Sequence, residues 1–322
     1  MKKVIVIGGG TGTFVALTGL KKYPLSLSAV ITMMDSGGST GRLRDQLGVL
    51  PPGDLRQALV ALSSSEKIWR DLFVYRFENG DLSGHNFGNI FISALEKITG
   101  SIEKALELAT KILQVKGEVI PVTFQKTELC VKLENGQVIE GETHIDEPGK
   151  IARRAPIARV YLYPQVSANP RALQKIKEAT AIIIGPGDLY TSIIPNLLVK
   201  GVKKALAKSS SKKIFVMNLM TKYGQTTDFT ASDHFSELKK HLGCDIDYVL
   251  INTKRPSDQT FKWYKSSKES IVFDDLPKKN KKIIRAILMD DLIIPKNQSD
   301  RLRRSIIRHN PDLLAKKIFP LL

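Results

Sequence analysis

The first twenty-two residues constrain the fold more than any other segment. A run of β-branched residues, Val4 to Ile7, ends at Gly8-Gly9-Gly10-Thr11-Gly12, and residues 14–22 then carry apolar side chains at helical spacing. A continuous apolar run is typical of a strand buried on both faces of a parallel sheet. A glycine loop that opens a helix presents free backbone N–H groups and the positive end of the helix dipole. The segment therefore predicts a β-loop-α unit that can hold phosphate.

This glycine loop matches neither of the two common nucleotide fingerprints. Gly8 and Gly10 fit a dinucleotide motif, but Thr13 stands where the third glycine belongs. No Lys-Ser or Lys-Thr pair follows, which excludes a nucleoside-triphosphate P-loop. A tight turn with no ligand is the alternative, but five small residues are more than a turn requires. The predicted phosphate-binding residues here are Gly9, Gly10, Thr11, Gly12 and Thr13.

Apolar strands and amphipathic helices alternate along the rest of the chain. Further strands are predicted at 27–34, 160–163, 181–184, 214–217, 248–251 and 283–288, and helices at 54–62, 68–77, 89–98, 102–115, 170–179 and in the tail from 301. This alternation predicts the α/β class, with a Rossmann-like parallel sheet and helices on both faces. Between 118 and 145 the apolar period approaches two, and Asn135-Gly136 indicates a hairpin. We therefore predict a single nucleotide-binding domain over 1–322 with a small β-rich insertion at about 117–158, one edge of which is available for homodimer contacts.

Two carboxylates follow the second predicted strand. Asp35 begins a polar loop and could accept a ribose hydroxyl, hold Mg²⁺, act as a base, or only start a turn. Asp54 lies at a helix start, where a simple N-cap is the competing interpretation. Arg42 could pair with phosphate through its guanidinium fork. The other ligand-binding candidates in this loop are Ser36, Gly37, Gly38 and Ser39.

Similar polar loops follow the later strands and precede helices. His85, Asn86 and Asn89 occupy one of them, although the two asparagines could be turn and cap residues. The other candidates are Gly185, Pro186, Gly187 and Ser192 in a second loop, and Asn218 and Thr221 in a third. Because ligands of open parallel sheets bind outside the carboxyl ends of the strands, we expect these groups to share one site.

Composition removes several classes of protein. The 322-residue chain carries a formal net charge of +17, but its lysines occur as scattered pairs and no nucleic-acid-binding motif is present, which argues against nucleic acid as a partner. No apolar stretch approaches the roughly 20 residues of a membrane-spanning helix, and the N-terminus has no secretory pattern. Cys130 and Cys244 lack metal-ligand spacing, so we expect a reducing cytoplasm, with a single bridge between them left open.

Taken in order, these motifs resemble the YvcK family of gluconeogenesis factors, which is related to the CofD-type 2-phospho-L-lactate transferases. The resemblance spans essentially the whole chain and rests on 8–12, 35–44, 51–54, 84–89 and 185–198. It implies a cytoplasmic, Rossmann-like protein that binds UDP-sugars such as UDP-N-acetylglucosamine. It further implies a role in cell shape and wall homeostasis during growth on gluconeogenic carbon sources, with regulatory protein partners.

The resemblance also assigns roles to single residues. In the transferases, carboxylates matching Asp35 and Asp54 work with Mg²⁺ to move a phospholactyl group from a guanylylated donor to a deazaflavin precursor, so these two would be catalytic and metal-binding only in a transferase. Arg308 is a candidate for the diphosphate and Tyr264 for the base or sugar. The pattern is nearer to the non-enzymatic branch, which favours binding without turnover.

Three positions depart from the family pattern. Asp188 replaces an expected Ser, Gln225 an expected Glu, and Asn310 an expected Asp. The leading hypothesis is a UDP-sugar-binding regulator. The alternatives are a phospholactate transferase that uses Mg²⁺ and an NAD-dependent oxidoreductase suggested by the first loop.

Overall fold

A seven-stranded parallel sheet forms the centre of the molecule. The computed structural model describes residues 1–147, 154–290 and 305–322. The strand order is β10-β9-β8-β7-β1-β2-β3, and every neighbouring pair is parallel. The strands are β1 (Lys2–Gly8), β2 (Leu25–Ile31), β3 (Glu118–Pro121), β7 (Ala181–Ile184), β8 (Lys212–Val216), β9 (Tyr248–Asn252) and β10 (Ile283–Ala286).

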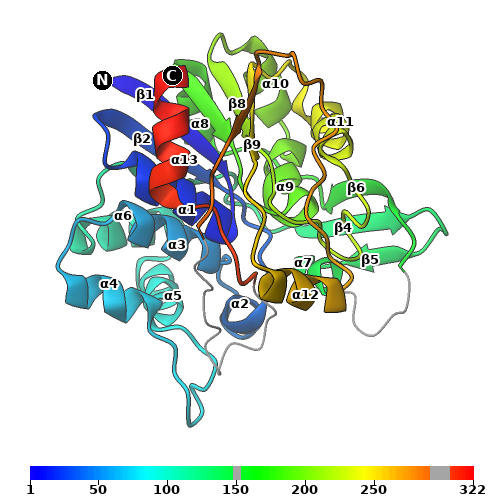
Figure 1. Cartoon of the computed structure of the whole chain (residues 1–322). Helices are drawn as coiled ribbons and strands as arrows, with labels where there is room; N and C mark the ends of the chain where they lie inside the picture. Colours follow the sequence, from blue (N-terminus) through cyan, green and yellow to red (C-terminus); the bar gives the residue numbers. More distant parts are fainter. Residues whose placement is uncertain (148–153, 291–304) are drawn as a thin grey trace.

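The chain changes direction across the sheet between β1 and β7. It first runs outward from β1 through β2 to β3, then returns to the centre at β7 and continues to β10. Right-handed crossovers that run in opposite directions place their helices on opposite faces. α1 contacts α3 and α13, whereas α10 contacts α8, α9 and α11, so the sheet lies between two helical layers (Figure 1).

Thirteen α-helices occur within the described residues. They are α1 (Gly10–Leu20), α2 (Gly38–Leu47), α3 (Gly53–Leu62), α4 (Lys67–Val74), α5 (Phe87–Thr99), α6 (Ile102–Ile112), α7 (Glu142–Asp146), α8 (Pro170–Glu178), α9 (Ile194–Leu198), α10 (Val202–Lys208), α11 (Ala231–Leu242), α12 (Asp258–Ser266) and α13 (Pro311–Ile318). A π-helical turn, η1 (Leu189–Ile193), precedes α9, and a 3-10 turn, η2 (Phe319–Leu321), ends the chain. None of the helices in the described parts is long and apolar enough to cross a membrane.

A second, antiparallel sheet lies to one side of the main one (Figure 1). It has the order β5-β4-β6, from β4 (Glu128–Leu133), β5 (Val138–Glu140) and β6 (Ile157–Tyr163). The predicted Asn135-Gly136 hairpin joins β4 to β5, and Gly136 has the positive φ (86°) that such a turn requires. The α/β class, the parallel sheet and the small β-rich insertion are therefore confirmed.

Several predicted boundaries need correction. Residues 118–121 belong to the main sheet, because β3 pairs in parallel with β2, and the antiparallel sheet extends to Tyr163. The loop after β2 contains a helix, α2, that the sequence did not predict. The tail is not helical throughout: residues 301–304 lie outside the described part, 305–310 are extended or bent, and the helix begins at Pro311. Both cysteines are free thiols.

Candidate functional site

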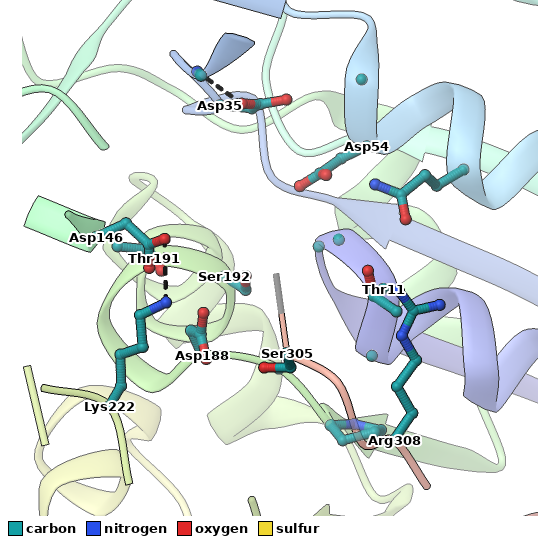
Figure 2. A pocket seen from close by; sticks show the side chains of 18 of the residues that line it. Thr11, Asp35, Asp54, Asp146, Asp188, Thr191, Ser192, Lys222, Ser305 and Arg308 are labelled. Atoms are coloured by element: carbon teal, nitrogen blue, oxygen red, sulfur yellow. Dashed lines mark hydrogen bonds and ion pairs between the residues drawn. The ribbon is translucent and has the colours of Figure 1, made fainter. Parts of the chain in front are cut away.

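A large cleft opens at the carboxyl edge of the main sheet, where strand order reverses between β1 and β7. Its empty volume is about 1550 Å³ including open solvent. Figure 2 shows side chains from both halves of the fold facing this space. The predicted residues that line it are Gly9, Gly10, Thr11, Gly12, Asp35, Gly37, Ser39, Asp54, Asn89, Pro186, Gly187, Ser192, Asn218, Thr221, Tyr264 and Arg308.

Two glycine loops meet at the centre of the cleft. Gly9 is the N-cap of α1, and the helix begins at Gly10, whose φ is +60°. A Cβ on Gly12 would collide with the Pro186 carbonyl group of the second loop. Glycine at position 12 therefore lets the loops after β1 and β7 pack directly together. As a result, the free N–H groups at the start of α1 face the same space as Gly187.

Asn218 fixes the second loop from the end of β8. Its side-chain Nδ2 donates to the Gly187 carbonyl at 2.8 Å. The loop then continues into η1, and the Ser192 N–H bonds the Asp188 carbonyl at 2.9 Å. Single π-helical turns are rare in proteins as a whole, but those that do occur are often found at functional sites. This turn brings Thr191 and Ser192 into the cleft lining (Figure 2).

The two predicted carboxylates line the cleft together. The Gly37 N–H donates to Asp35 Oδ1 at 2.9 Å, which orients that side chain. Asp54 lies in the first turn of α3 rather than at its N-cap, which is Pro52. Added Cβ atoms would strike Asp54 at Gly9 and Asp35 at Gly53, so glycines make room for both carboxylates.

Asp35 and Asp54 together could supply only part of the ligand shell of a magnesium ion. Mg²⁺ prefers oxygen ligands and is usually held by one or two carboxylates together with substrate phosphates and water. Within the described residues no group of three His, Cys, Asp or Glu side chains could hold a metal ion by itself. Asp35 and Asp54 are therefore the residues that would hold Mg²⁺, with ligand oxygens completing its shell.

The β-rich insertion contributes a third carboxyl group. Its helix α7 docks on the loop after β2 through Ser36, whose Oγ accepts from the Thr143 N–H at 3.0 Å. This contact brings Glu142 to the cleft lining. Burial raises the pKa of Glu142 well above its usual range, and the charges of Asp35 and its other acidic neighbours act in the same direction. The proton is therefore held more tightly on Glu142 than on an ordinary glutamate.

A buried lysine balances another group of carboxylates. Lys222 Nζ lies 3.2 Å from Asp146 Oδ2, and both side chains are less than one-fifth exposed. Burial alone would lower the pKa of this amine, but the charges of Asp146, Asp188 and Glu269 outweigh that effect and raise it. Lys222 thus offsets the negative charge that Asp188 brings to the second glycine loop.

The other two departures from the family pattern also have structural reasons. Gln225 Nε2 donates to Asp146 Oδ1 at 2.8 Å, which a glutamate could not do. Asn310 Oδ1 accepts from the Asp312 and Leu313 N–H groups at the start of α13. Its Nδ2 donates to Asp290 at 2.7 Å, a bond that an aspartate could not make.

The C-terminal segment forms one wall of the cleft. The Tyr264 hydroxyl accepts from the Ile306 and Ile307 N–H groups at 3.1 and 3.3 Å, so this buried tyrosine anchors the segment. The next residue is Arg308, whose side chain points toward Thr11 at the start of α1 (Figure 2). The predicted arginine and the first glycine loop therefore share one part of the cleft.

Some predicted residues support the cleft without lining it. They are Thr13, Ser36, Gly38, Arg42, His85, Asn86 and Gly185. Asn86 is the N-cap of α5, accepting from the Asn89 N–H at 3.2 Å, as the alternative interpretation predicted. His85 packs against Ser39 with 3.3 Å between Nδ1 and Oγ, and Arg42 donates to the Ser83 carbonyl at 2.9 Å.

The sequence did not predict several residues in the cleft. They include Arg56, Arg76, Glu142, Asp146, Lys222, Glu269 and His309. Arg56 had a local signal, a basic residue two positions after Asp54 on a largely apolar helix. It donates to Asn89 Oδ1 at 2.8 Å and to the Phe73 carbonyl at 3.0 Å. Glu142 had no such signal, because only the docking of α7 brings it to the site.

Comparison with known proteins now identifies the family. A family model described as "2-phospho-L-lactate transferase CofD" matches residues 4–292. The chain belongs to the CofD family. A relative from Bacillus subtilis named "Gluconeogenesis factor" is 39% identical over 323 residues, with 99% of this chain and 98% of the relative covered. Its counterpart of the same name in Halalkalibacterium halodurans is also 39% identical, covering 98% and 95% of the two chains.

A solved structure matches the whole CofD-family fold of this chain. The crystal structure of a protein of the UPF0052 family from Bacillus halodurans superposes with a TM-score of 0.89 at 37% identity, covering 99% of each chain. The predicted resemblance to the gluconeogenesis factors is therefore confirmed.

Proposed function

We propose that this protein binds a UDP-sugar in the cleft and acts as a cytoplasmic regulator of cell shape and wall homeostasis during gluconeogenic growth. The observation that carries this proposal is the meeting of the two glycine loops with Arg308 at the start of α1. Helix N-terminal N–H groups and an arginine are suited to a diphosphate. The names of its relatives support the link to gluconeogenesis.

The ligand would span both halves of the cleft. Its diphosphate would lie between the first loop and Gly187, near the positive end of α1. The nucleoside and sugar would extend toward the strand ends of β8 and the C-terminal segment. A regulator needs the ligand to change the affinity for a protein partner. The cleft is lined by loops of the main sheet, by α7 of the insertion and by the C-terminal segment, so one ligand could contact all three.

Thermal unfolding with UDP-N-acetylglucosamine, UDP-glucose, GDP and NAD, each with and without Mg²⁺, tests the proposal. A ligand at about 100 times its Kd adds ~2.7 kcal/mol of stability, which raises Tm by roughly 4 °C in a protein of this size. We expect this shift with UDP-sugars, its loss in Arg308→Ala and its retention in Arg159→Ala, an exposed arginine on β6. No shift with any UDP-sugar would refute the proposal.

Transfer of a phospholactyl group is the second candidate function, and the paired carboxylates favour it. Bound Mg²⁺ would supply charge neutralisation for the phosphates. Asp35 or Asp54 would accept the proton of the acceptor hydroxyl as its oxygen bonds the phosphorus of the phospholactyl group, and the diphosphate bond would break with guanosine monophosphate as the leaving group. This candidate requires Mg²⁺-dependent product formed from a guanylylated phospholactate donor and a deazaflavin acceptor, lost in Asp35→Asn. If the UDP-sugar stays intact after prolonged incubation and no product forms from the guanylylated donor, the transferase is excluded. The UDP-sugar-binding regulator is then the remaining hypothesis.

A further inference from the structure

Two lysine-rich segments that are far apart in the sequence meet at one edge of the main sheet. Residues 201–213 contain five lysines and residues 276–282 contain four, and neither segment contains an acidic residue. The first segment runs into β8, which begins at Lys212, and the second directly precedes β10, which begins at Ile283. Both strands are parallel to β9, which lies between them. The two segments therefore lie at the amino edge of the sheet, opposite the cleft at its carboxyl edge.

Hydrogen bonds hold both segments beside the strand that separates them. The Val249 N–H of β9 donates to the Lys282 carbonyl at 2.9 Å, and the Asp247 N–H donates to the Lys213 carbonyl at 2.9 Å. Because adjacent strands are about 4.8 Å apart, the segments at β8 and β10 are separated by roughly 10 Å. Lysines that are scattered as pairs in the sequence are thus gathered in space.

Six exposed lysines occupy this edge, and we call them the lysine edge: Lys208, Lys212, Lys278, Lys279, Lys281 and Lys282. Two acidic residues lie beside them. Asp245 pairs with Lys239 at 2.9 Å, and Asp247 Oδ2 accepts from the Lys213 N–H at 2.8 Å. A cation at the negative end of a helix accounts for Lys208 in the last turn of α10, but the four lysines before β10 lie in no helix. The edge therefore carries more positive charge than its acidic neighbours balance.

The residue types at this edge favour an anionic membrane surface over a protein or a nucleic acid. Neither segment contains an aromatic residue or an arginine, whereas protein interfaces depend on Trp, Tyr and Arg and are depleted in Lys. Binding of single-stranded nucleic acid uses aromatic side chains on which the bases stack. Phosphate-specific sites use arginine forks or helix N-termini, but α10 and α11 reach this edge with their C-termini.

An anionic lipid surface requires only clustered positive charge. Groups of about four to eight lysines or arginines bind anionic headgroups, and each lysine near the surface strengthens binding roughly fivefold. We propose that the lysine edge is a docking surface for an anionic membrane. In Figure 1, α10 lies at one end of the molecule, and α2, α7 and α12, which contribute to the cleft, lie toward the other. The docked protein therefore keeps its cleft open to solvent.

Co-sedimentation of the full chain with vesicles tests the proposal. Vesicles of phosphatidylcholine alone are compared with vesicles that also contain phosphatidylglycerol, at about 0.1 M NaCl, where exposed charges interact over ~10 Å. We expect binding only to the vesicles that contain phosphatidylglycerol. This binding should be lost at about 1 M NaCl, where screening shortens the distance to ~3 Å.

Two variants with the same net charge locate the binding surface. The edge variant combines Lys208→Gln, Lys279→Gln, Lys281→Gln and Lys282→Gln. The control variant changes exposed lysines on α4, α6, β4 and α12, and combines Lys67→Gln, Lys104→Gln, Lys132→Gln and Lys262→Gln. The edge variant should lose on the order of 100-fold in vesicle affinity, and the control less than about threefold. The Tm of both variants should stay near that of the wild type, because all the changed side chains are exposed.

Four results would overturn the proposal. If the wild type binds no vesicles, or binds both compositions equally, it has no surface specific for anionic lipid. Equal losses in the two variants would mean that the overall charge of +17, and not this edge, attracts the lipid. Stronger binding to a short DNA duplex than to the phosphatidylglycerol vesicles, lost in the edge variant, would make the edge a nucleic-acid surface instead.

Discussion

Removing the Lys222 amine should expose how strongly the cleft depends on its internal charge balance. Lys222→Met keeps the length of the side chain but leaves Asp146, Asp188 and Glu269 without the cation that faces them. Breaking a buried ion pair from one side costs about 3–5 kcal/mol. Because both partners retain a little under one-fifth of their side-chain exposure, we expect about 3 kcal/mol, the low end of that range.

Urea and thermal unfolding measure this loss. A change of about 3 kcal/mol lowers Tm by roughly 4–5 °C in a chain of this size. Lys200→Met is the matched control, since Lys200 is exposed and surface substitutions usually stay within ~0.5 kcal/mol. The raised pKa of Lys222 means that its contribution is complete below the unfolded value and is lost only as pH rises beyond it. The difference between variant and wild type should therefore be constant from about pH 6 to 9.

A double-mutant cycle identifies the partner. Asp146→Asn keeps an oxygen that can accept from Gln225 but removes the charge opposite Lys222. The Lys222→Met and Asp146→Asn changes should be less damaging together than their sum, with a coupling of about 1–3 kcal/mol. The reasoning would be refuted if the Tm of Lys222→Met lay within about 1 °C of the wild-type Tm. It would also be refuted if the free-energy changes of the two single variants simply added in the double variant.

Two further predictions follow from single side chains. The pKa of Glu142 is raised in the folded state, so the folded state binds this proton more tightly than the unfolded state. Stability therefore falls as pH rises through the interval between the usual and the raised pKa. Glu142→Gln should remove this loss, which is up to ~1.4 kcal/mol per pH unit, and a pH profile of Tm that is the same in the variant and the wild type would contradict the prediction. Asn310→Asp keeps the cap of α13 but sets a second carboxylate against Asp290. We expect about 1–2 kcal/mol of destabilisation in urea unfolding at pH 7, and a more stable variant at pH 7 would show that the Asp290 bond contributes nothing.

Most of the main sheet could be predicted because its signals are local. The apolar run of β1, the glycine loop and the stripe of α1 are adjacent in the sequence, and each agrees with the others. The same holds for α8, where Asn169 caps the helix and Pro170 occupies its first turn. Because the strands of the predicted sheet are parallel, the polar loops at their carboxyl ends are expected to meet at one edge of the sheet.

Helix α2 was missed because its composition resembles that of a loop. Its first turn contains glycine, serine and threonine, all weak helix formers in the middle of a helix. The reason for Gly41 is tertiary: a Cβ there would collide with the Ser36 carbonyl. A glycine selected for close packing looks the same in a sequence as one selected for a turn. The same limit applies to Glu142 and His309, whose places depend on contacts with Ser36 and Met217, 106 and 92 residues earlier in the chain.

The distribution of charge explains how an anionic ligand can enter a cleft with so many carboxylates. Asp35, Asp54 and Glu142 form one group, in which burial first, and then the charges of the acidic neighbours, raise the pKa of Glu142. Lys222 neutralises a second group, while the start of α1 and Arg308 provide the positive part of the site. A free diphosphate can approach only that positive part unless a divalent cation covers the first group. The dependence of diphosphate affinity on Mg²⁺ should therefore increase as the ligand extends further toward Asp35. A ligand that contacts only the start of α1 should bind without Mg²⁺.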